Sequence, residues 1–144
     1  KNDPSYDAGK DNGATGSMMW PCPSCHTITS EFGWRYHPIY HTQKYHSGVD
    51  IGASYGASIV AADGGTVITA GAVSGYGNCV VINHGNGITT LYGHMSSIAV
   101  SSGQKVSKGQ TIGYVGSTGN SPGPHLHWEV TVNGVRQNPL NYAR

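Results

Sequence analysis

The apolar residues of this chain occur in short runs that are rich in β-branched side chains and are separated by glycine-containing turns. Residues 58–62 (Ser-Ile-Val-Ala-Ala) and residues 66–70 (Thr-Val-Ile-Thr-Ala) flank an Asp-Gly-Gly turn at residues 63–65. Asp-Gly between two such runs is a strong hairpin signal, because glycine accepts the positive φ that the turn needs. The pattern therefore predicts that residues 58–62 and 66–70 pair as a β-hairpin.

The same turn signal occurs twice more, at Asn86-Gly87 and at Asn133-Gly134. Residues 78–83 and 88–92 lie on the two sides of the first of these turns and are expected to form a second hairpin. No window of about 11 residues carries the apolar stripe of an amphipathic helix. We therefore predict a mainly β fold, built as an antiparallel β-sheet with few or no helices.

Length and composition predict a single domain that does not bind nucleic acid. The chain has 144 residues, of which 10% are charged, and a formal net charge of +1. A nucleic-acid surface needs clustered Lys and Arg, and a membrane-spanning helix needs about 20 apolar residues in a row. We find neither pattern and expect no membrane insertion.

The two ends of the chain differ in composition. Residues 1–17 are rich in Asp, Asn, Gly and Ser, which predicts a flexible, dispensable linker, and residues 18–144 are expected to form the folded domain. The sequence starts without Met and shows no signal peptide. We therefore expect a monomeric domain taken from a longer chain.

The first candidate chemistry lies in residues 123–129, which read Gly-Pro-His-Leu-His-Trp-Glu. In a β-strand His125 and His127 point to the same face, about 6–7 Å apart, while Leu126 and Trp128 point to the other face, toward a core. Two imidazoles that point to one place suit metal binding, proton transfer or both.

A second pair, His46 and Asp50, is separated by three residues that include a glycine. In an ideal strand the two side chains would lie about 13 Å apart, too far for one ion with bonds of about 2 Å. Gly48 allows the chain to bend between them. Val49 and Ile51 are then expected to point into the core while Asp50 faces the site.

A fifth candidate, His94, ends an apolar run beside Gly93. Catalytic zinc uses three protein ligands from His, Asp, Glu or Cys and an open fourth position for water. The His46–Asp50 pair and the His125–His127 pair offer four ligands, one more than needed. From the residues alone, the surplus histidine and His94 are left for proton transfer.

A longer series of motifs resembles the M23 family of zinc metallopeptidases, the lysostaphin-like peptidoglycan endopeptidases. The similarity extends in order over residues 30–140, which makes chance similarity a poor explanation. It rests on the segments Phe32-Gly33-Trp34-Arg35-Tyr36-His37-Pro38-Ile39, His46-Ser47-Gly48-Val49-Asp50-Ile51, Gly75-Tyr76-Gly77-Asn78, His84-Gly85-Asn86-Gly87, Tyr92-Gly93-His94-Met95-Ser96, Gly103-Gln104-Lys105-Val106, Gly109-Gln110-Thr111-Ile112-Gly113, Gly116-Ser117-Thr118-Gly119 and Gly123-Pro124-His125-Leu126-His127.

This resemblance implies a site and a function. It assigns one zinc ion per domain to His46, Asp50 and His127, and it makes His94 and His125 the catalytic histidines. It implies an antiparallel sheet with a long substrate groove walled by loops. The implied protein is a zinc-dependent endopeptidase that hydrolyses the cross-links or bridges of bacterial peptidoglycan. Its expected location is extracellular, cell-wall-associated or in a phage particle.

The alternative is a non-catalytic cell-wall-binding or regulatory module, because some members of the family have lost ligands and act by binding partners. Here all five site positions carry the expected residue types, which favours the enzyme. A phage tail protein that carries the domain is compatible with the enzyme hypothesis. The bond that is cut, at a glycine bridge or at a cross-link containing D-amino acids, stays open.

Three cysteines are not explained by this site. We expect Cys22 and Cys25 to form a local disulfide or to be two free thiols. A second zinc site with His26 lacks an evident fourth ligand, and a thioredoxin-like pair needs a helix after the first cysteine. Cys79 lies in an apolar run and is predicted to be buried.

The remaining polar candidates receive simpler interpretations. His84 lies in a turn and is predicted to be exposed to solvent. Glu129 shares a face with the histidine pair, so it either orients one of them or is an exposed edge carboxylate. Arg35 anchors a substrate carboxylate or fixes its own loop, and His37 and His41 are expected to be structural or to lie at the rim of the site.

Overall fold

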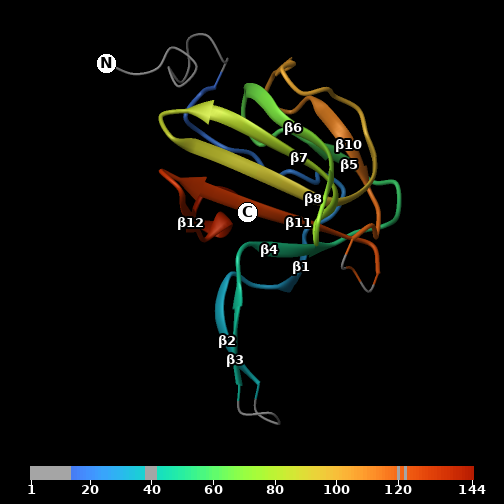
Figure 1. The fold of residues 1–144 in the computed structure, drawn as a ribbon, viewed down its shortest axis with the longest axis vertical. Coiled ribbons are helices and arrows are strands. Elements are labelled where there is room, and N and C mark those ends of the chain that lie inside the picture. The colour runs from blue at the N-terminus through green and yellow to red at the C-terminus, as the bar shows by residue number, and fades with distance from the viewer. Residues whose placement is uncertain (1–13, 38–41, 120, 122) are drawn as a thin grey trace.

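The structure, a computed structural model, describes residues 14–37, 42–119, 121 and 123–144, and for residues 35–44 it does not describe the side chains. The described elements are strands, apart from one turn of 3-10 helix (Figure 1). In chain order they are β1 (Thr27–Ser30), β2 (Gly33–His37), β3 (Thr42–His46), β4 (Val49–Gly52), β5 (Ser58–Val60), β6 (Gly65–Val73), β7 (Gly77–Gly85), β8 (Ile88–Ile98), β9 (Lys105–Val106), β10 (Thr111–Val115), β11 (His125–Val132), β12 (Val135–Gln137) and η2 (Pro139–Asn141).

Ten of these strands form one antiparallel sheet. Its main order is β1-β4-β11-β8-β7-β6-β9, and β5, β10 and β12 pair at its sides. The remaining two, β2 and β3, form a separate hairpin that extends away from the body of the domain in Figure 1. The mainly β, antiparallel prediction is confirmed. Within the described ranges, no helix has the length and apolar character needed to cross a membrane.

Two of the three predicted turns have the expected geometry. Asn86 and Gly87 have φ values of 52° and 77°, and they join β7 to β8. Asn133 and Gly134 have φ values of 51° and 80°, and they join β11 to β12. Two central residues with positive φ are what the twist of a two-residue hairpin requires, and Asn and Gly tolerate this conformation best.

The predicted hairpin between residues 58–62 and 66–70 is wrong. β5 pairs with β10, whereas β6 pairs with β7 and β9. Distant segments supply the backbone partners of residues 60–62. For example, Val60 N–H donates to the Pro21 carbonyl, and the Ala62 carbonyl accepts from Met19 N–H, both at 2.8 Å. These long-range bonds replace the local pairing that the Asp-Gly signal predicted.

The core lies behind the strands that carry the candidate site residues. Val49 and Ile51 of β4 and Leu126 and Trp128 of β11 are all fully buried, as the alternation of strand side chains predicted. An indole that buries about 200 Å² contributes about 5 kcal/mol at about 25 cal/mol per Å². This packing fixes the face to which the alternate residues of β4 and β11 point. Cys79 is also fully buried, as predicted.

His84 is buried rather than exposed, which corrects the prediction from its place beside a turn. Its side chain keeps 2% of its accessible surface. Nδ1–H donates to the Gly64 carbonyl at 2.8 Å, and the Thr90 hydroxyl lies 2.7 Å from Nε2. A register shift in the β7–β8 ladder lies between Asn83 and Gly85. Such an irregularity turns a side chain relative to simple alternation, and here it places His84 inside the protein.

The end of the predicted linker contacts the domain. Ala14 is buried, and the Asp63 carboxylate accepts hydrogen bonds from the backbone N–H groups of Thr15 and Gly16 at 3.0 Å. Gly64 N–H also donates to this carboxylate, at 2.8 Å. Residues 1–13 lie outside the described residues. A linker that ends at residue 17 stays a prediction. Among its described residues, Ala14, Thr15 and Gly16 contact the domain.

We predict that His84→Gln weakens the dependence of stability on acid. Burial lowers the pKa of His84 below its ordinary value of about 6.5. As pH falls through about 6.5, the unfolded state binds a proton that the folded state resists, so wild-type stability decreases. The variant lacks this titration. Urea unfolding between pH 7.5 and 5 checks it, and parallel pH profiles for the two proteins would contradict it.

We also predict that truncation at residue 14 and truncation at residue 18 have different effects. Removing residues 1–13 leaves the unfolding free energy nearly unchanged, because this segment is poor in apolar residues. Removing residues 1–17 lowers it by about 2 kcal/mol, because the buried Asp63 carboxylate loses the N–H donors of Thr15 and Gly16. Urea unfolding measures both, with the full chain as the control. Equal stability of the two truncated proteins would show that the Asp63 contacts contribute nothing.

Candidate active site

The register between β4 and β11 brings the two predicted motifs together. His127 lies opposite Asp50, and on its other side it lies opposite Gly93 of β8. Since Leu126 and Trp128 are held in the core, His125 and His127 point out of the same face of the sheet. The juxtaposition therefore follows from strand pairing between segments that are more than 70 residues apart in the sequence.

The Asp50 carboxylate is the centre of the site. His127 Nδ1 lies 2.8 Å and His125 Nε2 3.5 Å from Asp50 Oδ1, and His46 Nε2 lies 3.3 Å from Asp50 Oδ2. Burial by itself would raise the pKa of Asp50, but hydrogen bonds from these three imidazoles lower it far below its ordinary value. Asp50 therefore stays ionised throughout the physiological range.

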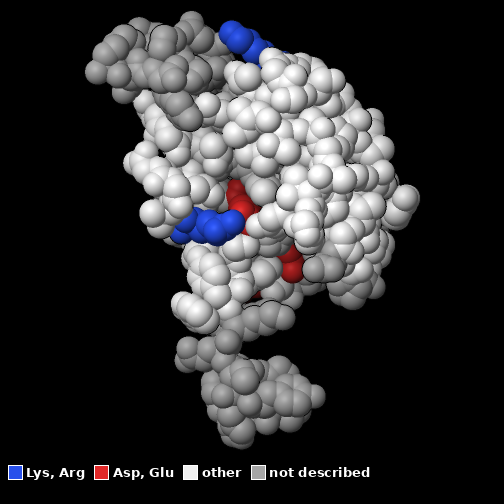
Figure 2. All heavy atoms as spheres, viewed as in Figure 1, with Lys and Arg blue, Asp and Glu red and all other residues white. Residues whose placement is uncertain are grey.

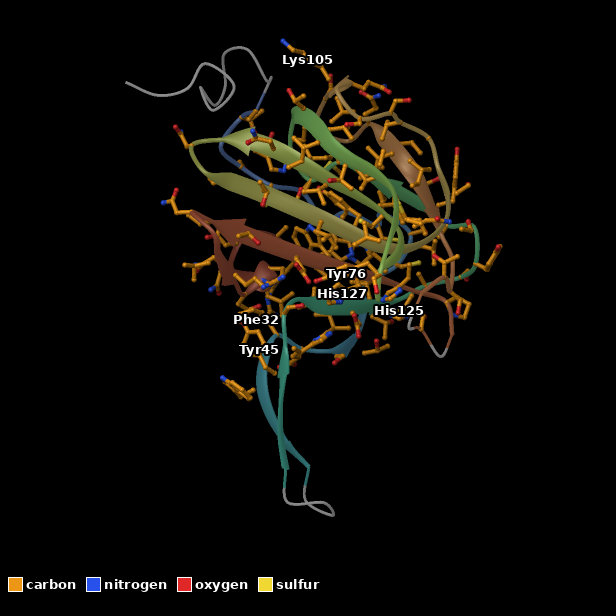
Figure 3. All side chains as sticks on the ribbon, in the orientation of Figure 1. Phe32, Tyr45, Tyr76, Lys105, His125 and His127 are labelled. Atoms are coloured by element: carbon orange, nitrogen blue, oxygen red, sulfur yellow. The ribbon has the colours of Figure 1, made fainter. Side chains whose placement is uncertain are left out.

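All five predicted site residues line one open pocket of about 240 Å³. In Figure 2 acidic side chains appear within a hollow of a surface that is otherwise largely uncharged. In Figure 3 His125, His127 and Tyr76 lie together, where β4, β8 and β11 meet. The pocket is lined by His46, Ser47, Asp50, Gly75, Tyr76, His94, His125 and His127.

Close packing explains the glycine between His46 and Asp50. A Cβ atom on Gly48 would lie 2.3 Å from the Trp128 carbonyl oxygen, so only glycine fits against β11 at this point. The bend that Gly48 permits brings His46 back toward Asp50, as predicted. The Glu31 carbonyl then accepts a hydrogen bond from His46 Nδ1–H at 2.9 Å, which leaves Nε2 directed at Asp50.

His94 is held by a strained backbone and by a backbone acceptor. Its φ is 62°, an uncommon value for a residue other than glycine. Its backbone N–H donates to the Tyr76 carbonyl at 2.7 Å, and its Nδ1–H donates to the Thr118 carbonyl at 2.6 Å. Its Nε2 therefore carries the lone pair. Outside a hairpin turn, such a conformation persists where the surrounding structure holds it, and here these two hydrogen bonds do so.

The His94 and His125 rings form a pair with different electrostatics. Their centroids lie 4.6 Å apart. Burial lowers the pKa of His94, whereas the hydrogen bond with Asp50 raises the pKa of His125. His125 Nδ1–H donates to the Gly123 carbonyl at 3.0 Å, so its Nε2 is the atom directed at Asp50. The pair thus combines a neutral imidazole with one that readily takes a charge.

Glu129 proves to be a buried partner of His127 rather than an edge carboxylate. It keeps 3% of its accessible surface, and Oε2 accepts a hydrogen bond from His127 Nε2–H at 2.9 Å. The hydroxyl groups of Ser47 and Tyr76 donate to the same oxygen at 2.6 and 2.7 Å. Arg136 Nε donates to the other oxygen at 3.1 Å. The carboxylate therefore fixes which nitrogen of His127 faces Asp50.

This network also shifts two pKa values in opposite directions. Burial opposes both charges, yet hydrogen bonds raise the pKa of His127 to about 9 and lower the pKa of Glu129 to about 2. Ser47 and Tyr76 were not singled out from the sequence, because nothing in their spacing distinguishes them from surface polar residues. Glu129 lies two residues after His127 and therefore on the same face of the strand. This spacing is the one sequence signal that points to the network.

The site offers a suitable set of ligands for a metal ion. Ligand atoms of His46, Asp50 and His127 lie within 4.8 Å of one another, and no other such group of three occurs among the described residues. Bonds of about 2.1 Å in a tetrahedron place ligand atoms about 3.4 Å apart, close to the contacts seen here. Two imidazoles and a carboxylate are also a common ligand set of catalytic zinc.

Three residues considered from the sequence are not placed by the structure. The side chains of Arg35 and His37, and the whole of His41, lie outside the described residues. The roles expected of Arg35, as a substrate anchor or a loop contact, and of His37 and His41, as structural or rim residues, remain predictions.

Comparison with known proteins agrees with this geometry. Residues 44–139 match the profile of Peptidase family M23. The chain is 47% identical over 116 residues to a DD-carboxypeptidase/endopeptidase, Mpg, of Neisseria meningitidis, and the match covers 81% of this chain. It spans only 27% of that relative's length.

Solved structures show the same fold. A zinc-containing peptidase from Vibrio cholerae superposes with a TM-score of 0.80 at 34% identity, covering 87% of this chain and 39% of the other. The catalytic domain of lysostaphin from Staphylococcus simulans superposes with a TM-score of 0.72 at 30% identity, covering 81% and 91% of the two chains.

We predict that Asp50→Asn and Glu129→Gln each lower the pKa of His127 in the metal-free protein. Each change removes a negative charge that stabilises the imidazolium, so the pKa falls from about 9 toward the ordinary value. NMR titration of the histidine ring protons measures the shift. The pKa of His84, which contacts neither carboxylate, should not move. An unchanged His127 pKa in both variants would show that the two carboxylates do not hold its charge.

Proposed function

The chain belongs to peptidase family M23, and on that basis we propose that it is a zinc-dependent endopeptidase that hydrolyses peptide bonds in bacterial peptidoglycan. The observation that carries the proposal is the convergence of His46 and His127 on Asp50, with a second histidine pair beside them. This arrangement separates a ligand set from residues that can move protons. A binding module would need neither feature.

We assign the zinc ion to His46 Nε2, Asp50 and His127 Nδ1. In each histidine the other ring nitrogen is already bonded, to the Glu31 carbonyl in His46 and to Glu129 in His127. These outer partners fix the tautomers that expose a nitrogen lone pair to the ion. A bound zinc ion supplies a coordinated water of lowered pKa and an electrophile for the scissile carbonyl.

We assign proton removal to His94 and the complementary donor role to His125. His94 is neutral because burial lowers its pKa, and its bond to the Thr118 carbonyl leaves Nε2 free to accept a proton. His125 Nδ1–H is held by the Gly123 carbonyl, so Nε2 faces the site, and the protonated ring can stabilise negative charge on the substrate or protonate the leaving amine. The two rings are close enough to act on one peptide bond.

The substrate is proposed to be a peptide of the cell wall. Glycine-rich loops such as Gly75-Tyr76-Gly77 border the site and permit close approach of an extended peptide backbone. The name of the Neisseria relative, a DD-carboxypeptidase/endopeptidase, favours cross-links between D-amino acids over glycine bridges. Such a substrate implies action outside the cytoplasm, in the cell envelope, in the medium or from a phage particle.

Digestion of defined muropeptides, followed by mass spectrometry of the products, tests the proposal. We expect the wild-type protein to bind one zinc ion and to cleave cross-linked dimers into monomers. Binding of these dimers by the zinc-loaded protein without any cleavage would instead identify the non-catalytic module.

We predict that variants at four of the five site residues separate into two classes. His46→Ala and Asp50→Ala lose both zinc and activity, because a ligand is removed. His94→Ala and His125→Ala keep zinc but lose turnover by about 10²–10⁴-fold, as expected for the loss of a general acid or base. Elemental analysis and muropeptide cleavage are the two measurements. His26→Ala, an exposed histidine outside the site, is the control. Full zinc occupancy in Asp50→Ala would refute the ligand assignment.

A further inference from the structure

Cys22 and Cys25 occupy the two ends of a β-turn. Cys25 N–H donates to the Cys22 carbonyl at 3.0 Å and closes the turn. Both thiols are free. The ends of a β-turn lie within about 7 Å between Cα atoms, and disulfides need about 4.4–6.8 Å. The turn therefore brings the two Cα atoms into the range of separations that a disulfide spans.

This turn anchors the start of the domain. Cys22 is fully buried in the core, and Cys25 packs against the core with partial exposure. The Trp20 indole N–H donates to the Cys25 carbonyl at 2.6 Å, and the Trp20 ring contacts Trp128 edge to face, with centroids 5.9 Å apart. Movement of the turn would therefore disturb the core directly beneath β11.

The turn also leads to the candidate active site. It precedes β1, which pairs with β4 through Ile28 opposite Ile51 and Ser30 opposite Asp50. The next residue, Glu31, supplies the carbonyl that orients His46. A constraint at the start of β1 thus acts on the strand that flanks Asp50 and on the segment that holds His46.

We propose that Cys22 and Cys25 form an intramolecular disulfide that clamps β1 onto the domain core. The disulfide rests on the proposed function in one respect, the redox environment. A protein that acts on peptidoglycan works outside the cytoplasm, where disulfides persist. The disulfide links residues that are already adjacent in the fold, so it forms without rearrangement of the core.

The two thiols differ in pKa and exposure, and this difference sets which thiol reacts first. Partial burial would raise the pKa of Cys25, but hydrogen bonds from Ser24 and from the Ser54 backbone lower it, while burial raises the pKa of Cys22 to about 12. The partly exposed Cys25 thiolate attacks an external disulfide and releases one thiol. Cys22 then loses its proton and attacks the Cys25 sulfur, which releases the second thiol. Two S–H groups become one S–S bond, and the oxidant disulfide is reduced to two thiols.

A metal ion accounts less well for the pair. No group of three metal-ligating side chains involving these cysteines occurs among the described residues. His26, the nearest histidine in the sequence, stacks on Trp20 with centroids 5.7 Å apart, and its Nε2 lies 3.0 Å from the Pro23 carbonyl. Its ring is therefore committed to other contacts.

The experiment oxidises the wild-type chain with oxidised glutathione and then blocks the remaining thiols with iodoacetamide under denaturing conditions. Mass spectrometry should find one alkyl group instead of the three found after reduction, and peptide mapping should link Cys22 to Cys25. The oxidised protein should melt about 3–8 °C above the reduced protein, because a short closed loop removes a modest amount of unfolded-state entropy.

Two variants distinguish this clamp from a disulfide that involves Cys79 and from a second zinc site. Cys79→Ala should keep the redox-dependent shift in Tm, and the Cys22→Ala, Cys25→Ser double variant should lose it. Three alkyl groups after oxidation, a bond to Cys79, or loss of a second equivalent of zinc in the double variant would each overturn the proposal. Because the peptide mapping uses the wild-type chain, it tests whether the disulfide forms even if the double variant folds poorly. Neither readout involves peptide cleavage, so failure here leaves the endopeptidase assignment to its own test.

Discussion

The antiparallel register between β4 and β11 is the constraint on which the rest of the site depends. It places Asp50 opposite His127 and Ile51 opposite Leu126. A slip by one residue would turn the buried residues of one strand to the solvent and its polar residues to the core, so burial of Ile51 and Trp128 enforces the register. The same apolar packing that stabilises the sheet therefore also assembles the polar cluster on its other face.

Charge balance explains how this face carries two carboxylates without losing stability. Burial makes an unpaired carboxylate costly, but Asp50 is surrounded by three imidazoles, and Glu129 has four donors, including Arg136. His127 lies between the two carboxylates and bonds to one through each ring nitrogen. In this arrangement Glu129 is a positioning residue, because it acts on the site through the orientation of His127.

Support for the site comes from parts of the chain that lie far from it in the sequence. Carbonyl groups of Glu31 and Thr118 each fix one imidazole, and both belong to segments outside the strands that carry the imidazoles. Gly48 allows β11 to approach closely, because any side chain there would collide with the Trp128 carbonyl. Backbone carbonyl groups, which substitution does not remove, therefore orient two of the imidazoles of the site.

The sequence by itself determined the fold class and two of the turns, and it singled out five side chains that line one pocket in the structure. Alternation of apolar and polar residues placed Leu126 and Trp128 in the core and the two histidines on the opposite face, and Asn-Gly pairs specified positive φ at two turns. These are local properties, set by the pleat of a strand and by the sterics of a turn.

Only the tertiary structure decided what depends on partners from distant segments. The pairing of β5 with β10, the burial of His84 and the four donors to Glu129 have no local signature, because each depends on which strands become neighbours. The Asp-Gly turn at residues 63–65 shows the limit of local inference most clearly. Its residues suit a hairpin, but the backbone groups of the preceding run bond to residues 19–21 and to β10 instead, because those contacts also build the core.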